Sequence, residues 1–229
     1  MSLKCYYDLM SQPSRAVYIF LKANKIPFEE KPIALRKGEH LTEEYKKINP
    51  LQKVPVIDDN GFILSESVAI LKYLSLKFDI GDNWYPKNDL KRQARVDEYL
   101  NWQHINTRLN AAMIFQHLLL IPRMTGKPVQ EKQMARFKKG LIESVGHIDK
   151  YFLGSQPFLC GDKISVADLL GACELMQLHG VHEESFYTNN PVVKAWIERV
   201  RNRLAPHFDD AHKIIFRTRD VYPALKAKM

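Results

Sequence analysis

The chain has 229 residues, 45% of them apolar and 26% charged, which is typical of a folded protein with a sizeable core. Its formal net charge of +8 would suit nucleic acid or an anionic membrane, but basic and acidic residues alternate, as in EEYKKINP. Because no stripe of interleaved basic and aromatic residues follows the chain, we expect an ordinary basic globular protein that does not bind nucleic acid.

The first eighty residues alternate strand and helix patterns. The segment of residues 4–9 is short and rich in aromatic side chains, which predicts a strand. Residues 14–24 carry apolar side chains at helical spacing and end at Asn24, a plausible stop, and residues 27–35 again resemble a strand. A strand, a helix and a second strand in succession predict that the two strands are parallel.

The next segments complete this unit. Residues 39–50 predict a short polar helix that ends before Pro50. Two apolar runs around Asn60-Gly61 within residues 53–66 predict a β-hairpin. Residues 65–78 form an amphipathic helical pattern. The resulting order predicts a thioredoxin-like α/β sheet with mixed strand directions.

Everything after residue 88 has helical patterns. Residues 89–122 predict one long helix that stops before Pro122. Further helices are predicted at residues 129–154, 164–180 and 191–204, and a partly helical segment at 206–229. Within the third helix, Ser165 and Asp168 have the spacing of a capping box, which favours a helix start over a catalytic role.

These patterns divide the chain into two domains. A thioredoxin-like α/β domain is expected at residues 1–79, and an all-α helical domain at residues 89–229. Residues 80–88 contain glycine, proline and asparagine and are interpreted as a linker.

The cysteines and the N-terminus indicate the compartment. Cys5, Cys160 and Cys173 are far apart and form no C-x-x-C pair, which predicts free thiols rather than dithiol chemistry. The start MSLKCYYDLM lacks the apolar core of a signal peptide, and no apolar run approaches the ~20 residues of a membrane span. We therefore expect a cytoplasmic protein without a membrane partner.

Three motifs carry a resemblance to a known family. They are DLMSQPSRAVYIF, KVPVIDDNGFILSESVAILKYL and ARVDEYLNWQH. Together with the two-domain order, they resemble the cytosolic glutathione transferases, and the serine at the first strand-to-helix turn is similar to that of the theta class. The resemblance covers nearly the whole chain and implies the glutathione transferase fold.

The resemblance assigns several residues to glutathione binding. It implies that the Val54-Pro55 peptide is cis and that the Val54 backbone pairs with glutathione, whereas the residues alone would favour a trans bond. Ser67, at a helix start, would hold the γ-glutamyl carboxylate, and Glu66 the ammonium group. The same helix start needs a cap, which Ser65 or Ser67 would supply.

Further residues complete the implied site. His40 is placed near the glycyl carboxylate, Lys53 would add positive charge there, and Gln12 lies beside Ser11. Arg108 is implied to point at the sulfur or at the leaving group. Taken alone, His40 resembles a surface histidine, and Arg108 a solvated or ion-paired arginine.

Ser11 has two interpretations. As part of MSQPS it can cap a helix that has Pro13 in its first turn. A serine hydrolase reading is weak, because the sequence lacks an elbow such as G-x-S-x-G. The resemblance implies that Ser11 donates a hydrogen bond to the thiolate of glutathione. If Ser11 proves to be only a cap, Ser14 is the alternative.

The free energies of these interactions are large enough for Ser11 to stabilise the thiolate without a general base. A free thiol has a pKa near ~8.5. Lowering that pKa by ~2 requires ~2.7 kcal/mol of preferential thiolate stabilisation. A hydrogen bond to a charged group supplies roughly 1.5–3 kcal/mol, and a helix N-terminus adds up to ~1–2 kcal/mol.

The resemblance predicts an enzyme that conjugates glutathione to electrophiles such as halides, epoxides and reactive alkenes, with glutathione peroxidase activity as a further family property. It also predicts a homodimer with no cofactor besides glutathione as co-substrate. No metal pattern is seen, since His179 and His182 lack further ligands. Tyr6 and Tyr7 are expected in the core or in the second substrate site.

The electrophile pocket is expected around Leu9, Met10 and residues 113–117. Because the chain stops soon after RDVYPALKAKM, without the C-terminal extension usual in theta enzymes, we expect a more open pocket. Two alternatives remain: a non-catalytic glutathione-binding or ligand-binding protein, and a protein-interaction module on the same fold. The presence of Ser11, Val54-Pro55 and Glu66-Ser67 argues against the interaction module.

Overall fold

Four strands form the sheet in the N-terminal part of the protein, in a computed structural model that describes residues 3–227. Their bounds are β1 (Leu3–Tyr7), β2 (Phe28–Pro32), β3 (Val56–Asp59) and β4 (Phe62–Ser65). In the order β2-β1-β3-β4, β1 is parallel to β2, and the other two pairs are antiparallel. The predicted parallel pair and the predicted hairpin are therefore confirmed.

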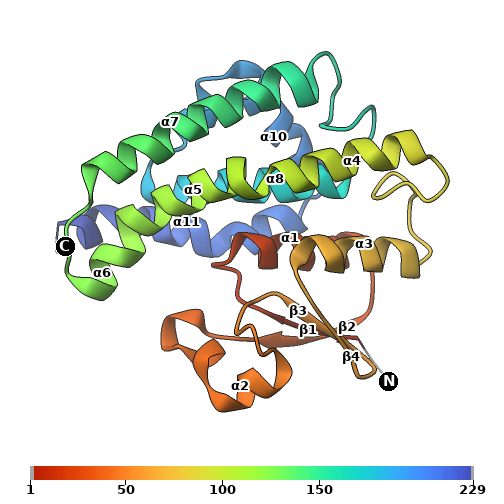
Figure 1. The fold of residues 1–229 in the computed structure, drawn as a ribbon, viewed down its shortest axis with the longest axis horizontal. Coiled ribbons are helices and arrows are strands. Elements are labelled where there is room, and N and C mark those ends of the chain that lie inside the picture. The colour runs from red at the N-terminus through yellow and green to blue at the C-terminus, as the bar shows by residue number, and fades with distance from the viewer. Residues whose placement is uncertain (1–2, 228–229) are drawn as a thin grey trace.

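Three α-helices accompany the sheet. They are α1 (Gln12–Ala23), α2 (Glu43–Ile48) and α3 (Ser67–Lys77). Figure 1 shows α1 and α3 between the sheet and the remaining helices, while α2 lies away from those helices. Two 3-10 turns, η1 (Leu35–Lys37) and η2 (Glu39–Leu41), lead into α2. The predicted α/β arrangement of this part is confirmed.

A long helical rod follows the sheet-bearing part. Its segments are α4 (Leu90–Trp102), η3 (His104–Arg108), α5 (Leu109–Phe115), η4 (Gln116–Leu120) and α6 (Ile121–Thr125). The predicted stop before Pro122 is wrong. A proline ring clashes with the preceding turn of a regular α-helix. Here the π turn η4 lies just before Pro122 and widens the helix. The rod therefore continues to Thr125 and ends at Gly126, whose φ is 65°.

The remaining helices pack around this rod (Figure 1). They are α7 (Glu131–His147), η5 (Ile148–Leu153), α8 (Val166–Met176), η6 (Gln177–Val181), α9 (Ser185–Thr188), α10 (Pro191–Arg203) and α11 (His207–Lys226). The final segment was expected to be only partly helical, yet α11 runs through twenty residues. The end of that predicted segment, residues 228–229, lies outside the described residues.

The two parts are joined between α3 and α4. The first ends at Lys77 and the second begins at Leu90. The domain limits 1–79 and 89–229 with a linker at 80–88 stay a prediction. None of the helices within residues 3–227 has the length and apolar character needed to cross a membrane.

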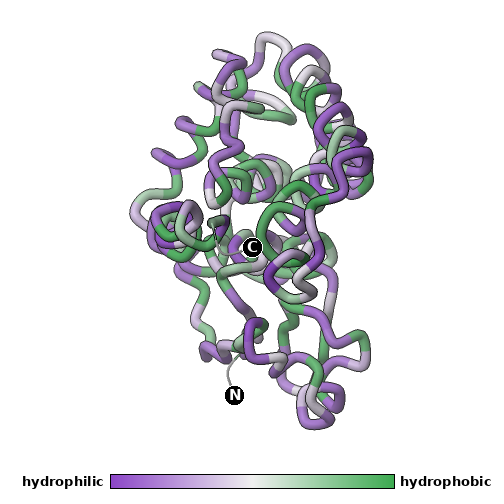
Figure 2. The backbone as a smooth tube through the Cα atoms, turned by 90° about the vertical axis from the view of Figure 1, so that its left-hand side faces the viewer, coloured by the Kyte–Doolittle hydropathy of each residue, from purple (hydrophilic) through white to green (hydrophobic). Residues whose placement is uncertain are grey.

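The centre of the helical part is α8. All eleven of its residues are buried, and the capping box predicted at Ser165 and Asp168 is present. Figure 2 shows hydrophobic stretches mostly inside the molecule and hydrophilic stretches mostly on the outer helices. The contacts between α1 and α8 tie the sheet-bearing part to this centre. Burial of apolar area at these contacts is the main source of stability.

One core residue, His212 on α11, makes stability sensitive to pH. Its ring is fully buried and stacks on Phe208 at a centroid distance of 4.2 Å. Its Nδ1 lies 2.7 Å from the Phe208 carbonyl, and its Nε2 has no hydrogen-bond partner among the described residues. Burial, with the nearby charge of Arg15 as a second cause, holds the pKa of His212 well below its ordinary value.

We expect the free energy of unfolding to fall as the pH is lowered below about 6.5, by up to ~1.4 kcal/mol per pH unit from His212. The unfolded chain binds a proton there that the folded chain cannot accept at His212, so acid favours unfolding. Denaturant titrations from pH 7.5 to 5 measure this slope. His212→Phe should reduce it, while His147→Gln, at an exposed histidine, should leave it unchanged. An unchanged slope in His212→Phe would refute the assignment.

Candidate active site

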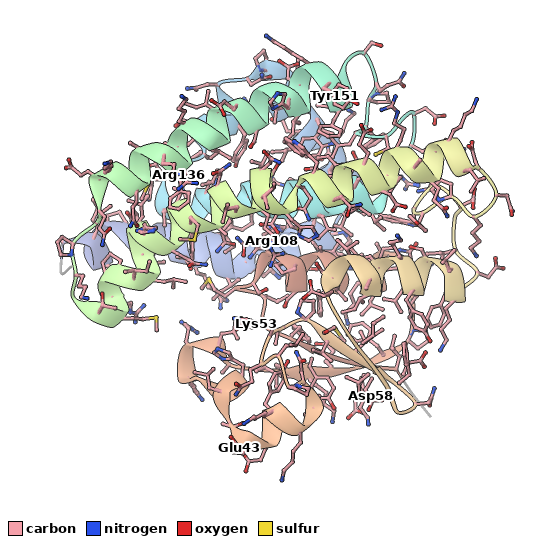
Figure 3. All side chains as sticks on the ribbon, in the orientation of Figure 1. Glu43, Lys53, Asp58, Arg108, Arg136 and Tyr151 are labelled. Carbon is pink, nitrogen blue, oxygen red and sulfur yellow. The ribbon has the colours of Figure 1, made fainter. Side chains whose placement is uncertain are left out.

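A cavity of about 250 Å³ lies where the sheet-bearing part meets the long rod. Figure 3 shows Lys53 on the sheet side and Arg108 on the rod side of this junction. The cavity is lined by six of the residues that the resemblance assigned to catalysis or glutathione binding: Ser11, Gln12, His40, Lys53, Val54 and Arg108. Segments far apart in the chain therefore bring these candidate residues together in space.

Ser11 occupies the N-cap position of α1, but its side chain does not cap the helix. Its backbone is extended, at φ −81° and ψ 124°. Its amide donates to the Asp8 carbonyl at 2.9 Å, and its carbonyl accepts the Arg15 amide at 3.0 Å. The hydroxyl makes no capping hydrogen bond within residues 3–227. The capping interpretation is therefore wrong for the Ser11 side chain, and the hydroxyl is available to a ligand.

Arg15 holds the turn that carries Ser11. Its side chain is fully buried, and Nη1 donates to the carbonyls of Leu9 at 2.9 Å and Met10 at 3.3 Å. Nη2 donates to the Cys173 carbonyl at 3.1 Å and to Gln177 Oε1 at 2.6 Å. One guanidinium thus fastens the turn to α8 and η6.

Sequence reasoning missed both Arg15 and Gln177, although Gln177 also lines the cavity. The one available signal was that Arg15 lies four positions before Ile19, on the apolar face of α1. A charged residue on such a face requires buried partners. Two of those partners, on α8 and η6, are more than 150 positions away in the sequence, and only the packing of α1 on α8 identifies them.

The segment before β3 forms the opposite wall. The Val54-Pro55 peptide is cis, which confirms that prediction. The Lys53 carbonyl accepts hydrogen bonds from Tyr45 Oη at 2.6 Å and Asn49 Nδ2 at 2.9 Å, so this segment is anchored to α2. That carbonyl is therefore already hydrogen-bonded within the protein, whereas the side chain of Lys53 is exposed. Pro55 is buried and does not line the cavity within the described chain.

His40, on η2, adds a neutral polar group beside Lys53. Burial, and then the charge of Lys53, lower the pKa of His40 below its ordinary value. Its Nδ1 is buried and has no hydrogen-bond partner within residues 3–227. A neutral imidazole can donate one hydrogen bond and accept another, so His40 can bind a polar ligand without carrying charge.

The long rod supplies the apolar wall. Arg108 is followed along the same face by Ala112, Phe115, Gln116 and Leu120. This spacing of three or four residues is one face of a helix. Of the predicted electrophile pocket, Met10, Phe115 and Gln116 line the cavity. The described lining does not include the other expected residues, which are Leu9, Met113, Ile114 and His117.

The end of α11 packs against this wall. Tyr222 and Leu225 join an apolar cluster that includes Phe115, Leu120 and Met10. Up to Ala227, α11 contributes no residue to the cavity lining. Whether the electrophile pocket is more open than in other theta enzymes stays a prediction.

Glu66 and Ser67 lie at the start of α3, outside this cavity in the described part of the chain. Glu66 is the N-cap residue and has a positive φ of 67°, a conformation that is costly for a residue other than glycine. No side chain caps α3 in the described structure, so the expected cap by Ser65 or Ser67 is wrong. The strained Glu66 and the uncapped helix start leave amide donors available for an anionic group.

Other reactive side chains lie away from the cavity. Tyr7 is buried, and its hydroxyl donates to Glu30 at 2.5 Å. Burial raises the pKa of the Cys5 and Cys173 thiols to about 12, and both are free. Within residues 3–227, no group of three or more His, Cys, Asp or Glu side chains is arranged to hold a metal ion.

Comparison with known proteins places this geometry in a family. The model of the glutathione S-transferase N-terminal domain matches residues 1–75, and that of the C-terminal domain matches residues 120–205. Glutathione S-transferase theta-1 from Bos taurus is 43% identical, over 100% of this chain and 96% of the relative.

Two solved human structures are also similar. A theta-class glutathione transferase in complex with the glutathione conjugate of 1-menaphthyl sulfate has a TM-score of 0.92 and 39% identity, covering 98% of this chain and 91% of that one. Glutathione transferase theta-2 in complex with glutathione and an unknown ligand has a TM-score of 0.92 and 38% identity, covering 97% and 90%.

The chain therefore belongs to the glutathione S-transferase family, with the fold that its sequence predicted. Within that family it is a theta-class enzyme, and its activity is glutathione transfer. The predictions of family, class and transferase activity are confirmed. The non-catalytic and interaction-module alternatives are not favoured by these relatives.

Proposed function

We propose that the cavity binds glutathione with its sulfur next to Ser11, and that the Ser11 hydroxyl donates a hydrogen bond to the thiolate. The observation that carries this is that Ser11 lines the cavity and that its side chain is not used as a helix cap. A hydrogen bond to a charged group and the N-terminus of α1 both favour the thiolate over the thiol. The activated thiolate then attacks the electrophile.

Each remaining site residue has a proposed role. The Val54 backbone pairs with the cysteinyl backbone of glutathione. Gln12, His40 and Lys53 bind the parts of glutathione that adjoin this cysteine. The start of α3 binds the γ-glutamyl end through Glu66 and Ser67, beyond the cavity around the sulfur. This assignment is supported by the strained Glu66 backbone and the uncapped amides of α3.

Arg108 is proposed to stabilise the thiolate or the departing anion from the rod side. It lines the cavity opposite the sheet side, and its guanidinium supplies a positive charge there. The apolar wall that follows along the rod suits an electrophile with an apolar body, such as an alkyl or aralkyl halide, an epoxide or a reactive alkene. Glutathione peroxidase activity stays a prediction.

Thiolate absorbance tests the proposed site directly. The ultraviolet absorbance of glutathione bound to the wild-type protein should titrate with a pKa about 2 below that of the free thiol at ~8.5. Conjugation of an aralkyl halide at neutral pH should follow the same titration. Glutathione that binds with the pKa of the free thiol would contradict the proposed activation.

We also propose a cytoplasmic homodimer. Exposed apolar side chains on β4 and on the rod support a self-association surface: Phe62, Ile63, Ile105 and Leu109. Three free cysteines support a reducing compartment. Sedimentation equilibrium would give twice the chain mass for the dimer, and cell fractionation would find the protein with cytoplasmic markers. A monomer at micromolar concentration or a membrane-bound fraction would contradict these proposals.

A further inference from the structure

Glu174, on α8, is a fully buried carboxylate behind the cavity wall. Its Oε1 lies 3.3 Å from Arg108 Nη1. Its Oε2 is buried and has no hydrogen-bond partner among the described residues. A buried carboxylate is costly unless its charge is paired and hydrogen-bonded. Packing alone therefore does not explain a glutamate at this position.

Arg108 connects this carboxylate to the cavity. About 35% of its side chain is exposed, whereas that of its partner Glu174 is 0% exposed. Arg108 closes the π turn η3, in which its amide donates to the Gln103 carbonyl at 2.9 Å. The extra residue of a π turn rotates the following side chains by about 100°, the angle of one residue in a helix. This local geometry sets the direction in which Arg108 leaves the rod.

A second guanidinium acts on the same carboxylate. Burial raises the pKa of Glu174, and the charges of Arg108 and then Arg15 oppose that rise. The positive charges of two arginines therefore act on this one buried carboxyl group. Arg15 is immobilised by four hydrogen bonds, whereas within the described residues the Arg108 side chain is held by Glu174 alone. Loss of Glu174 would therefore release Arg108 rather than Arg15.

We propose that Glu174 is a positioning residue of the transferase reaction, which holds the Arg108 guanidinium at the cavity wall where its charge stabilises the glutathione thiolate. This inference rests on the proposed role of Arg108. Without its anchor, the long side chain of Arg108 can extend into water and keep only its stem on the wall. Glu174 touches neither substrate and acts only through Arg108.

Arginine labelling tests whether Glu174 holds Arg108. Phenylglyoxal modification of Arg108, followed by peptide mass spectrometry, is compared between the wild-type protein and Glu174→Gln, which keeps the side-chain shape. The rate should rise about two- to five-fold, the factor expected when a partly exposed ion pair is lost. Glu183→Gln is the matched control, since it removes the partner of Lys138 and should leave Arg108 labelling unchanged.

A double-mutant cycle tests whether the contact between Glu174 and Arg108 stabilises the glutathione thiolate. Glu174→Gln is made with Arg108 present and in the Arg108→Ala protein, and the thiol pKa of bound glutathione is titrated in all four proteins. The Arg108→Ala background measures the direct effect of removing the carboxylate charge, so the difference isolates the effect that passes through Arg108. We expect Glu174→Gln to raise the thiol pKa by about 0.5 to 1 more when Arg108 is present than in the Arg108→Ala protein.

The outcomes separate this inference from the function on which it rests. Unchanged labelling of Arg108 in Glu174→Gln, or no coupling in the cycle, would overturn the positioning role alone. An unchanged thiol pKa in Arg108→Ala would overturn the proposed role of Arg108 and this inference with it. Faster labelling together with positive coupling supports the inference.

Discussion

Replacement of Ser11 by alanine should raise the pKa of the bound glutathione thiol by about 1 to 2, because it removes a hydrogen bond worth roughly 1.5–3 kcal/mol to the thiolate. At neutral pH the thiolate fraction falls accordingly, and kcat/KM should drop about 3- to 25-fold. The loss should shrink at alkaline pH, where the thiol ionises without help. Ultraviolet titration of bound glutathione and a pH profile of kcat/KM measure both effects.

Ser14→Ala is the matched control. Ser14 lies one turn further along α1, and its hydroxyl is buried without a hydrogen-bond partner in the described residues, so its removal should leave the thiol pKa unchanged. Thermal unfolding separates the chemical role of Ser11 from capping. A lost cap costs about 1 kcal/mol, whereas Ser11→Ala should hardly change the melting temperature. If Ser14→Ala instead raises the thiol pKa, the assignment belongs to Ser14.

Much of the site follows from local sequence. The hairpin around Asn60-Gly61 depends on two residues that readily adopt positive φ, which are 55° and 93° here. The turn at Ser11 is a strand followed by a helix start with Pro13 in the first turn. Ser11 follows β1 and Val54 precedes the antiparallel β3, so the two residues lie at the same end of the sheet. Their functional assignment came from the resemblance to a family.

The rest depends on packing that the sequence does not display. The partners of Arg15 and Arg108 lie on α8 and η6, and no periodicity relates α1 or the rod to those segments. The course of the rod through Pro122 also depended on a π turn, which leaves no propensity signal. At α3, the strained Glu66 took the N-cap position that serines were expected to fill. Sequence patterns thus identified the helices but not their contacts.

Asp168 is the residue whose loss should most reduce stability. It is fully buried, and its two oxygens accept four hydrogen bonds. Oδ1 accepts the Leu159 amide at 2.8 Å and Trp196 Nε1 at 2.9 Å. Oδ2 accepts the Ser165 amide at 2.8 Å and its hydroxyl at 2.9 Å. One carboxylate therefore joins the start of α8, the loop before it and α10.

Asp168→Ala should destabilise the protein by about 3–5 kcal/mol, since it leaves four donors unpaired in the core. For a chain of this size, that is a fall of about 10 °C in melting temperature. Asp168→Asn retains one acceptor oxygen and should lower the free energy of unfolding by roughly half as much. Asp162→Ala, at an exposed position in the same loop, should hardly change it. Because α8 also carries Glu174 and the Cys173 carbonyl, a stable Asp168→Ala protein would contradict both this network and the central position of α8 behind the site.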